Sequence, residues 1–192
     1  MKKNLITAVL MTIATTILLG IIYPLIVTGL AQVLFPKQAN GQLIVKDGKV
    51  IGSAILAQGF TSPGYFHPRA SAAGNGYDPT NTNGSQLGPT NQKLIDRVKG
   101  DVAAAQTENP GTPVPIDLVT TSASGLDPDI TPANAKFQML RVAHERSAMA
   151  ADIEKLVAEH TMNRQWGFLG EPRVNVLELN LALDERFPLA HK

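Results

Sequence analysis

The sequence predicts an α+β protein, with one N-terminal transmembrane helix followed by a single mixed α+β extracytoplasmic domain that contains a long irregular Gly/Asn/Pro loop. Three observations support this prediction. No charged residue occurs among the 33 positions from Asn4 to Pro36. Strand and helix patterns then follow without a regular βαβ rhythm. Residues 59–91, which lie among these patterns, have the composition of neither element.

The uncharged segment is long enough to cross a membrane. A helix of roughly 20 apolar residues spans the hydrocarbon core, and residues 5–35 exceed that length. Threonines in this segment can return their hydroxyls to backbone carbonyls, which makes them tolerable in lipid. The core of a signal peptide is usually only about 7–15 residues. We therefore favour a retained span over a cleaved signal peptide ending near Gly29-Leu30-Ala31.

Charges beside the span indicate its orientation. Lys2 and Lys3 lie in the short tail of residues 1–4, and the next cation is Lys37. Because cations nearest a span favour the cytoplasmic side, we expect a cytoplasmic N-terminus. Residues 37–192 would then form the extracytoplasmic domain of a single-pass protein.

Composition excludes several classes of protein. The chain has 17 Lys+Arg and 16 Asp+Glu, and almost all of these charges follow the span. A nearly neutral domain lacks the basic face with which nucleic-acid binders replace phosphate counterions. The chain has no cysteine, which excludes disulfides, thiolate metal sites and cysteine nucleophiles.

Local patterns predict the elements of the domain. Apolar arms around Asp47-Gly48 indicate a β-hairpin over residues 43–51, and residues 53–56 could add a strand. Asn91 can cap a helix, and Thr131 followed by Pro132 can begin another. In chain order, the further predictions are a helix over 91–107, a strand over 116–120, a helix over 131–145, a helix capped by Ser147 and ending near 160, a strand over 174–179 and a short final helix.

Residues 59–91 form the predicted irregular loop. They are rich in Gly, Pro, Asn, Ser and Thr, and their only formal charges are Arg69 and Asp78. Disordered segments are usually poor in aromatic residues, whereas this one holds four of the ten in the chain. We expect an ordered surface that docks on a partner through Phe60, Tyr65, Phe66, Arg69 and Tyr77. For Arg69 two roles remain open: orienting the loop through a buried carboxylate or carbonyl, or contacting the partner.

Few residues form a catalytic or metal-binding pattern. Ser122-Ala123-Ser124-Gly125 lacks the first glycine of a Gly-x-Ser-x-Gly nucleophile loop, so a simple turn is favoured. Asp127-Pro128-Asp129 lacks the third ligand of a hard-cation site, which favours a turn leading to the Thr131 cap. The histidines show no metal-ligand spacing; they are His67, His144, His160 and His191.

Taken in order, several blocks of the chain resemble the C subunit of the potassium-transporting P-type ATPase of bacteria, the Kdp complex. The most distinctive block is residues 122–132, Ser-Ala-Ser-Gly-Leu-Asp-Pro-Asp-Ile-Thr-Pro. The others are the membrane segment ending in Tyr23-Pro24 and residues 52–60, 65–72, 84–91, 113–120 and 174–183. The chain departs from the family pattern within residues 69–72 and 83–87, where the family usually has Arg-Pro-Ser-Ala and Gly-Gly-Ser-Asn-Leu.

The resemblance implies a non-catalytic subunit of an ATP-driven potassium importer in the bacterial inner membrane. Its partners would be the channel-like, ion-selecting A subunit, the P-type pump or B subunit, the small F subunit and membrane lipid, but no nucleic acid. No firmly bound cofactor is expected, although ATP could act through the pump. The family is described as a catalytic chaperone that raises the ATP affinity of the B subunit. Its nucleotide-contacting block corresponds here to Ser122, Ser124 and Gly125.

These implications leave more than one function open. We favour a structural role, in which the loop of residues 59–91 packs on the ion-selecting subunit, over direct nucleotide binding. Two alternatives come from other classes. One is a signal-anchored extracytoplasmic hydrolase that uses Ser122 or Ser124, and the other is an anchored module whose polar loop binds a small ligand.

Overall fold

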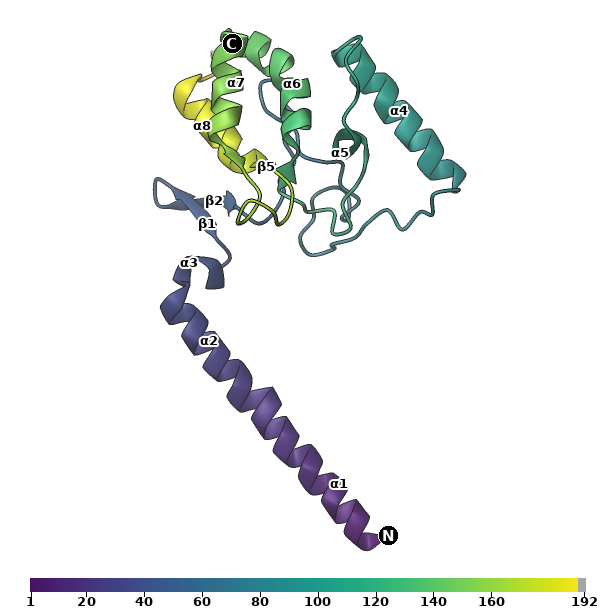
Figure 1. The fold of residues 1–192 in the computed structure, drawn as a ribbon, viewed down its shortest axis with the longest axis vertical. Helices are drawn as coiled ribbons and strands as arrows, with labels where there is room; N and C mark the ends of the chain where they lie inside the picture. The colour runs from purple at the N-terminus through teal and green to yellow at the C-terminus, as the bar shows by residue number, and fades with distance from the viewer. Residues whose placement is uncertain (190–192) are drawn as a thin grey trace. The chain divides into compact units, whose positions relative to one another are not determined.

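The computed structural model describes residues 1–189. The chain divides after Ile51 into two units, which we describe separately. In chain order (Figure 1), the elements up to the division are α1 (Lys2–Thr15), the π-helical segment η1 (Thr16–Ile22), α2 (Tyr23–Leu34), α3 (Pro36–Ala39), β1 (Leu43–Lys46) and β2 (Lys49–Ser53), which runs into the second unit. The later elements are α4 (Gln92–Glu108), α5 (Ile116–Val119), β3 (Asp129–Ile130), α6 (Pro132–Glu145), α7 (Ala150–Glu159), β4 (Thr161–Met162), β5 (Arg173–Asn175) and α8 (Val176–Arg186).

The first unit begins with a continuous apolar helix over Lys2–Leu34, long and apolar enough to cross a membrane. Its 33 residues extend for about 50 Å, against about 30 Å of hydrocarbon. The π-helical segment ends at Ile22, two residues before Pro24, whose ring would collide with a carbonyl of the preceding turn in a regular helix. As predicted, threonine hydroxyls donate to backbone carbonyls: Thr7 to Lys3, Thr12 to Ala8 and Thr15 to Met11, at 3.0, 2.9 and 2.8 Å.

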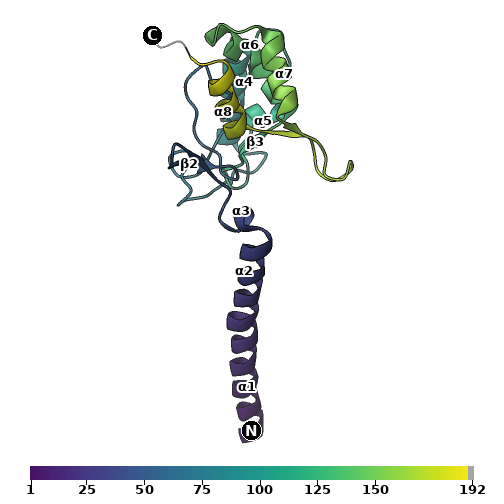
Figure 2. The ribbon, with the colours of Figure 1, turned by 90° about the vertical axis from the view of Figure 1, so that its left-hand side faces the viewer.

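The core of the second unit lies among α6, α7, α8 and a small antiparallel sheet of order β3-β5-β4 (Figures 1 and 2). In the sheet, Asp129 is opposite Asn175 and Thr161 is opposite Val174. Each helix buries residues at helical spacing against the core. The core comprises Phe66, Ile130, Ala135, Met139, Val142, Ala143, Ile153, Leu156, Val157, Val174, Val176, Leu179 and Leu183.

Helix α4 lies beside the group formed by α6, α7, α8 and the sheet, and it packs against α5 (Figure 1). As predicted, Asn91 caps it by accepting a hydrogen bond from the backbone N–H of Lys93, at 2.9 Å. Its far end is tied to α6, because the Asn109 amide donates to the Phe137 carbonyl at 3.0 Å. The predicted hairpin and the helix capped by Thr131 are also confirmed.

Two predicted strands are wrong. Residues 116–120 instead contain the helical turn α5, after which the Thr120 hydroxyl donates to the Ile116 carbonyl at 2.8 Å. The buried Asp117 carboxylate of this turn accepts hydrogen bonds from Thr131 and Asn134, an interaction that fixes the turn. Ser53 is the last residue of β2, and residues 54–56 form a turn rather than a new strand.

Two predicted boundaries also differ from the structure. The strand predicted over 174–179 ends at Asn175, whose side chain accepts from the Glu178 N–H at 3.1 Å and caps α8. Val176 and Leu179 are buried on the helix rather than on a strand. Ser147 does not cap α7, since it has a φ of +50° and the helix begins at Ala150 after Met149.

Residues 54–91 contain neither helix nor strand, and side-chain amides of two helices hold their backbone. The Phe66 N–H donates to Asn180 Oδ1, and Asn180 Nδ2 donates to the Phe66 carbonyl, both at 2.9 Å. Gln138 binds the N–H and the carbonyl of His67 in the same way, at 2.8 and 3.0 Å. Each amide thus supplies the pair of hydrogen bonds that a neighbouring strand would supply. We call these two interactions the amide clamps.

Removing one clamp is expected to destabilise the whole domain. Asn180→Ala leaves a buried N–H and a buried carbonyl of Phe66 without partners, which should lower the free energy of unfolding by about 3 kcal/mol. Urea unfolding of the full chain in detergent, followed by circular dichroism, measures this loss. Asn163→Ala, at an exposed position, is the matched control and should change it by less than about 0.5 kcal/mol. Equal stability of the two variants would contradict the clamp.

Candidate functional site

A buried arginine at the end of α6 holds the beginning of the irregular loop. The side chain of Arg146 has no exposed area and pairs with Asp184 at 3.0 Å. Its guanidinium also donates to the carbonyls of Gly64 and Phe187, at 2.6 and 2.7 Å. It lies 4.7 Å from the centre of the Tyr65 ring. A buried cation is tolerated when its donors are all used in this manner.

Arg141, five residues earlier on α6, holds the same part of the loop. It donates to the carbonyls of Tyr65, at 2.9 Å, and of Pro63. It also binds Glu108 at 2.8 Å, so it connects the loop to the end of α4. Neither arginine was predicted from the sequence. The available signal was two arginines five residues apart, near the end of a predicted helix.

The aromatic residues predicted to dock on a partner contact their own domain. Phe66 is completely buried, so its side chain belongs to the core rather than to a free surface. The Tyr65 hydroxyl donates to Asp184 at 3.1 Å, and the Phe60 ring lies 5.4 Å from the Tyr65 ring. The Tyr77 hydroxyl donates to the Arg69 carbonyl at 2.9 Å. A docking role for the loop stays a prediction, and the side chain of Phe66 does not contribute a contact surface to it.

Arg69 orients the loop, which was one of its two open roles. Its guanidinium forms an ion pair with Asp127 at 2.9 Å. It also lies 3.4 Å from the Thr121 carbonyl oxygen, to which it donates. The loop is thereby fixed to the segment that precedes β3.

The Ser-Ala-Ser-Gly segment forms a tight turn that is bound to the irregular loop. The Ser122 and Ser124 hydroxyls accept hydrogen bonds from the backbone N–H groups of Gly125 and Leu126, at 3.0 and 3.1 Å. The Gly125 carbonyl accepts from the Ser71 hydroxyl at 2.6 Å. Within residues 1–189, neither serine hydroxyl is hydrogen-bonded to a histidine. The nucleotide contact predicted for this segment stays a prediction.

Gly125 is required at its position for two reasons. Its φ of +70° lies in the left-handed region, which costs a side-chain-bearing residue about 1–2 kcal/mol. A Cβ atom there would stand 2.6 Å from the Asn83 carbonyl oxygen and 2.8 Å from the Ala73 nitrogen. The close approach of three backbone segments therefore depends on this glycine.

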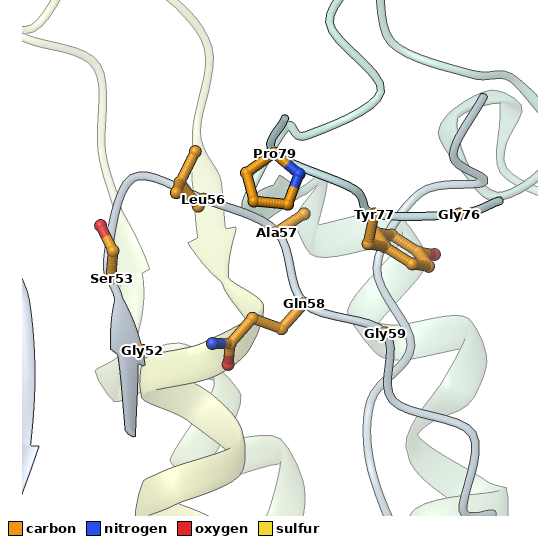
Figure 3. Close-up of a pocket in the computed structure, with 9 residues that line it drawn as sticks. All are labelled: Gly52, Ser53, Leu56, Ala57, Gln58, Gly59, Gly76, Tyr77 and Pro79. Carbon is orange, nitrogen blue, oxygen red and sulfur yellow. The ribbon is translucent and has the colours of Figure 1, made fainter. Parts of the chain in front are cut away.

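An open pocket of about 660 Å³ lies between residues 52–59 and residues 76–79. Figure 3 shows Gln58 and the Tyr77 ring on the wall of the pocket. Gly59, which follows Gln58 in the chain, also lines it. No charged residue lines the pocket; its lining consists of Gly52, Ser53, Leu56, Ala57, Gln58, Gly59, Gly76, Tyr77 and Pro79. An uncharged lining suits a neutral molecule better than the polyphosphate of a nucleotide.

The acidic segment before α6 leads to the Thr131 cap, as predicted, but Asp129 begins strand β3 rather than lying in a turn. Asp127 Oδ1 accepts from the Asp129 N–H at 3.1 Å, and the Thr131 hydroxyl accepts from the Asn134 N–H. Burial, together with the nearby Asp127 carboxylate, raises the pKa of Asp129, although its ion pair with Arg173 opposes this.

Among the described residues, no group of three or more His, Asp or Glu could hold a metal ion; His191 lies outside them.

Aromatic and aliphatic side chains are exposed at the tip of the β4–β5 connection. Figure 2 shows this connection as a narrow ribbon that extends away from the helices. Trp166 and Phe168 are 78% and 67% exposed, and Leu169 is 42% exposed. The Gln165 N–H donates to the Leu169 carbonyl at 2.8 Å and closes the turn. We call residues 165–169 the apolar tip. It was not predicted from the sequence.

Two substitutions in the tight turn separate backbone geometry from hydroxyl chemistry. Gly125→Ala should lower the free energy of unfolding by about 2–3 kcal/mol, since it adds a Cβ at a crowded, left-handed position. Ser124→Ala removes one partly exposed hydrogen bond and should cost about 0.5–1 kcal/mol. Urea titration of both full-length variants in detergent measures the difference. A Gly125→Ala variant as stable as the parent chain would show that the turn is not tightly packed.

His67 should make the domain less stable in mild acid. Burial of its ring, and then the charge of Arg141, lower the pKa of this histidine. The unfolded chain therefore takes up a proton first as the pH falls through about 6.5, and the folded state loses stability below that value. Above it the histidine is neutral in both states and has no effect. The drop in urea midpoint between about pH 7.5 and about pH 5.5 should be smaller in His67→Gln than in the parent chain; an equal drop would exclude His67.

Comparison with known proteins identifies the family. A family model described as "K+-transporting ATPase, c chain" matches residues 5–185. The Potassium-transporting ATPase KdpC subunit of Koribacter versatilis is 64% identical over 98% of this chain and 98% of its own length. The KdpC subunit of Rhodospirillum rubrum is 57% identical over the full length of both chains. These matches confirm the resemblance predicted from the sequence, and the chain belongs to the KdpC family of potassium-transporting ATPase subunits.

Proposed function

We propose that this membrane-associated subunit is an accessory, non-catalytic component that assembles and stabilises a potassium-transporting ATPase. The observation that carries the proposal is the rigid irregular loop. Two amide clamps and two arginines hold its backbone, which leaves a preformed surface without regular secondary structure. A preformed surface binds a partner at a lower entropic cost than a flexible segment does.

The proposal assigns partners and a topology. The N-terminal helix anchors the chain in the bacterial inner membrane, with residues 1–4 in the cytoplasm and the domain from residue 37 outside it. The loop of residues 59–91 docks on the channel-like, ion-selecting A subunit. The P-type pump, which is the B subunit, and the small F subunit complete the complex. Because Phe66 is a core residue, docking uses the outer surface of the loop.

The apolar tip is the second docking element in this proposal. Phe60, Tyr65 and Phe66 pack on their own domain, whereas Trp166 and Phe168 are mostly exposed. Large aromatic side chains are the residues that most often dominate the energetics of protein interfaces. Because the chain belongs to a family of ATPase subunits, the partner of the apolar tip in this proposal is a neighbouring subunit of the same complex.

Substitutions on the two surfaces test the proposal without disturbing the core. Asn81→Arg places a bulky cation on the exposed side of the loop, and Trp166→Ala truncates the apolar tip. We expect each to lower the recovery of the pump and channel-like subunits with a tagged chain, in mild detergent, at unchanged domain stability. Ala151→Arg, on the exposed side of α7, is the matched control. Unchanged recovery for both variants would refute docking through these surfaces.

A nucleotide role for Ser122, Ser124 and Gly125 is the competing proposal. The exposure of Ser124 at the surface of the tight turn favours it, because an incoming phosphate or ribose could reach its hydroxyl. In that mechanism the chain raises the ATP affinity of the pump. Ser124→Ala should then raise the ATP concentration needed for half-maximal ATPase activity of the complex and leave subunit recovery intact. The structural mechanism predicts no change in that concentration.

A further inference from the structure

The hairpin that follows the membrane helix presents an uncovered apolar face. Its turn consists of Asp47 and Gly48, with φ values of +52° and +75°, as a two-residue hairpin turn requires. Such a turn places Val45 opposite Val50, and residues directly opposite each other point to the same side. Leu43, two positions from Val45, shares that side. These three side chains are 51%, 58% and 53% exposed, in chain order.

An uncovered apolar face is unfavourable for a structure of this size. The sheet formed by β1 and β2 has only two strands. A two-stranded hairpin is marginally stable in water unless its apolar face packs on something. The position and the charges of the first unit indicate what covers this face.

Chain length keeps the hairpin close to the end of the membrane helix. Eight residues, 35–42, separate the end of α2 from β1, and four of them form α3. Four helical residues advance about 6 Å and four extended residues at most about 14 Å, so β1 begins within about 20 Å of the helix end. Asn40 shortens this reach, since its amide donates to the Gln32 side chain on α2 at 3.0 Å.

The charges of the same segment complement an anionic surface. Residues 35–51 contain Lys37, Lys46 and Lys49 but only one acid, Asp47. Each Lys near an anionic leaflet is attracted to it, and its long stem can follow an apolar surface while the ammonium reaches a phosphate. A second copy of this segment would instead present the same excess of positive charge. Charge complementarity therefore favours lipid over self-association.

We propose that residues 36–51 form an interfacial anchor that binds anionic lipid headgroups. The face made by Leu43, Val45 and Val50 lies at the boundary between headgroups and acyl chains. Lys46 and Lys49 alternate to the other side of the hairpin, so their long stems reach past its edge to the headgroup phosphates, which Lys37 also binds. The anchor acts on whichever side of the membrane the hairpin emerges. It does not depend on the partner subunits and is therefore independent of the function proposed above.

A single reporter on the hairpin tests this proposal. Because the chain has no cysteine, Val45→Cys provides one site for a polarity-sensitive fluorophore on the full-length chain. The labelled chain is reconstituted alone into vesicles of phosphatidylcholine, with or without phosphatidylglycerol. With phosphatidylglycerol we expect severalfold weaker quenching by aqueous acrylamide and stronger quenching by a lipid-attached quencher. Ala151→Cys on α7, an exposed position, is the matched control and should stay open to acrylamide in both vesicles.

Three results would overturn the proposal. The first is equal acrylamide quenching of the Val45→Cys label in both kinds of vesicle. The second is protection that rises with the ratio of protein to lipid, which would assign the face to a second copy. The third is protection that appears only when partner subunits are added. In Lys37→Gln/Lys46→Gln/Lys49→Gln, loss of the phosphatidylglycerol-dependent protection is expected, and full retention would refute the headgroup contacts.

Discussion

The second unit depends on one kind of interaction, the side-chain amide that substitutes for a missing strand. Its core is small and its sheet strands are two or three residues long, so Phe66 has to come from an irregular segment. Bringing that ring into the core also buries backbone groups that cannot remain unpaired. Asn180 and Gln138 supply the missing partners from α8 and α6. The buried polar residues of these helices therefore form part of the core.

The clamps belong to a longer polar network that connects distant parts of the chain. Gln138 donates to Asn134, and Asn134 donates to Asp117 of α5 at 3.0 Å. Arg141 and Arg146 extend the network from α6 to residues 63–65 of the loop. In a low-dielectric interior such a network is stabilising only when every member is satisfied. This requirement explains how a segment rich in glycine and polar residues acquires one conformation.

Features that depend on neighbouring residues could be predicted from the sequence, whereas contacts between residues far apart in the chain could not. The Asp47-Gly48 turn, the Asn91 and Thr131 caps and the apolar N-terminal helix each rest on neighbouring residues, and each was predicted. Residues 174–179 were predicted as a strand because alternation and helical spacing coincide there; the Asn175 cap decides between them only in the folded chain. Similarly, no local pattern indicates that Arg146 meets Gly64, 82 positions away. The aromatic residues of the loop suggested a docking surface, but Phe66 belongs to the core, whereas Trp166 and Phe168, outside the loop, are exposed.

The burial of Phe66 also has a consequence for the cooperativity of the domain. Irregular segments usually open by local fluctuations that leave the rest of a protein intact. Here the loop cannot lift away without withdrawing a ring from the centre of the core and breaking both clamps. The amide hydrogens of residues 66 and 67 should therefore exchange with solvent only when the helices themselves unfold. A segment that resembles a linker in composition thus belongs to the slowest-exchanging part of the molecule.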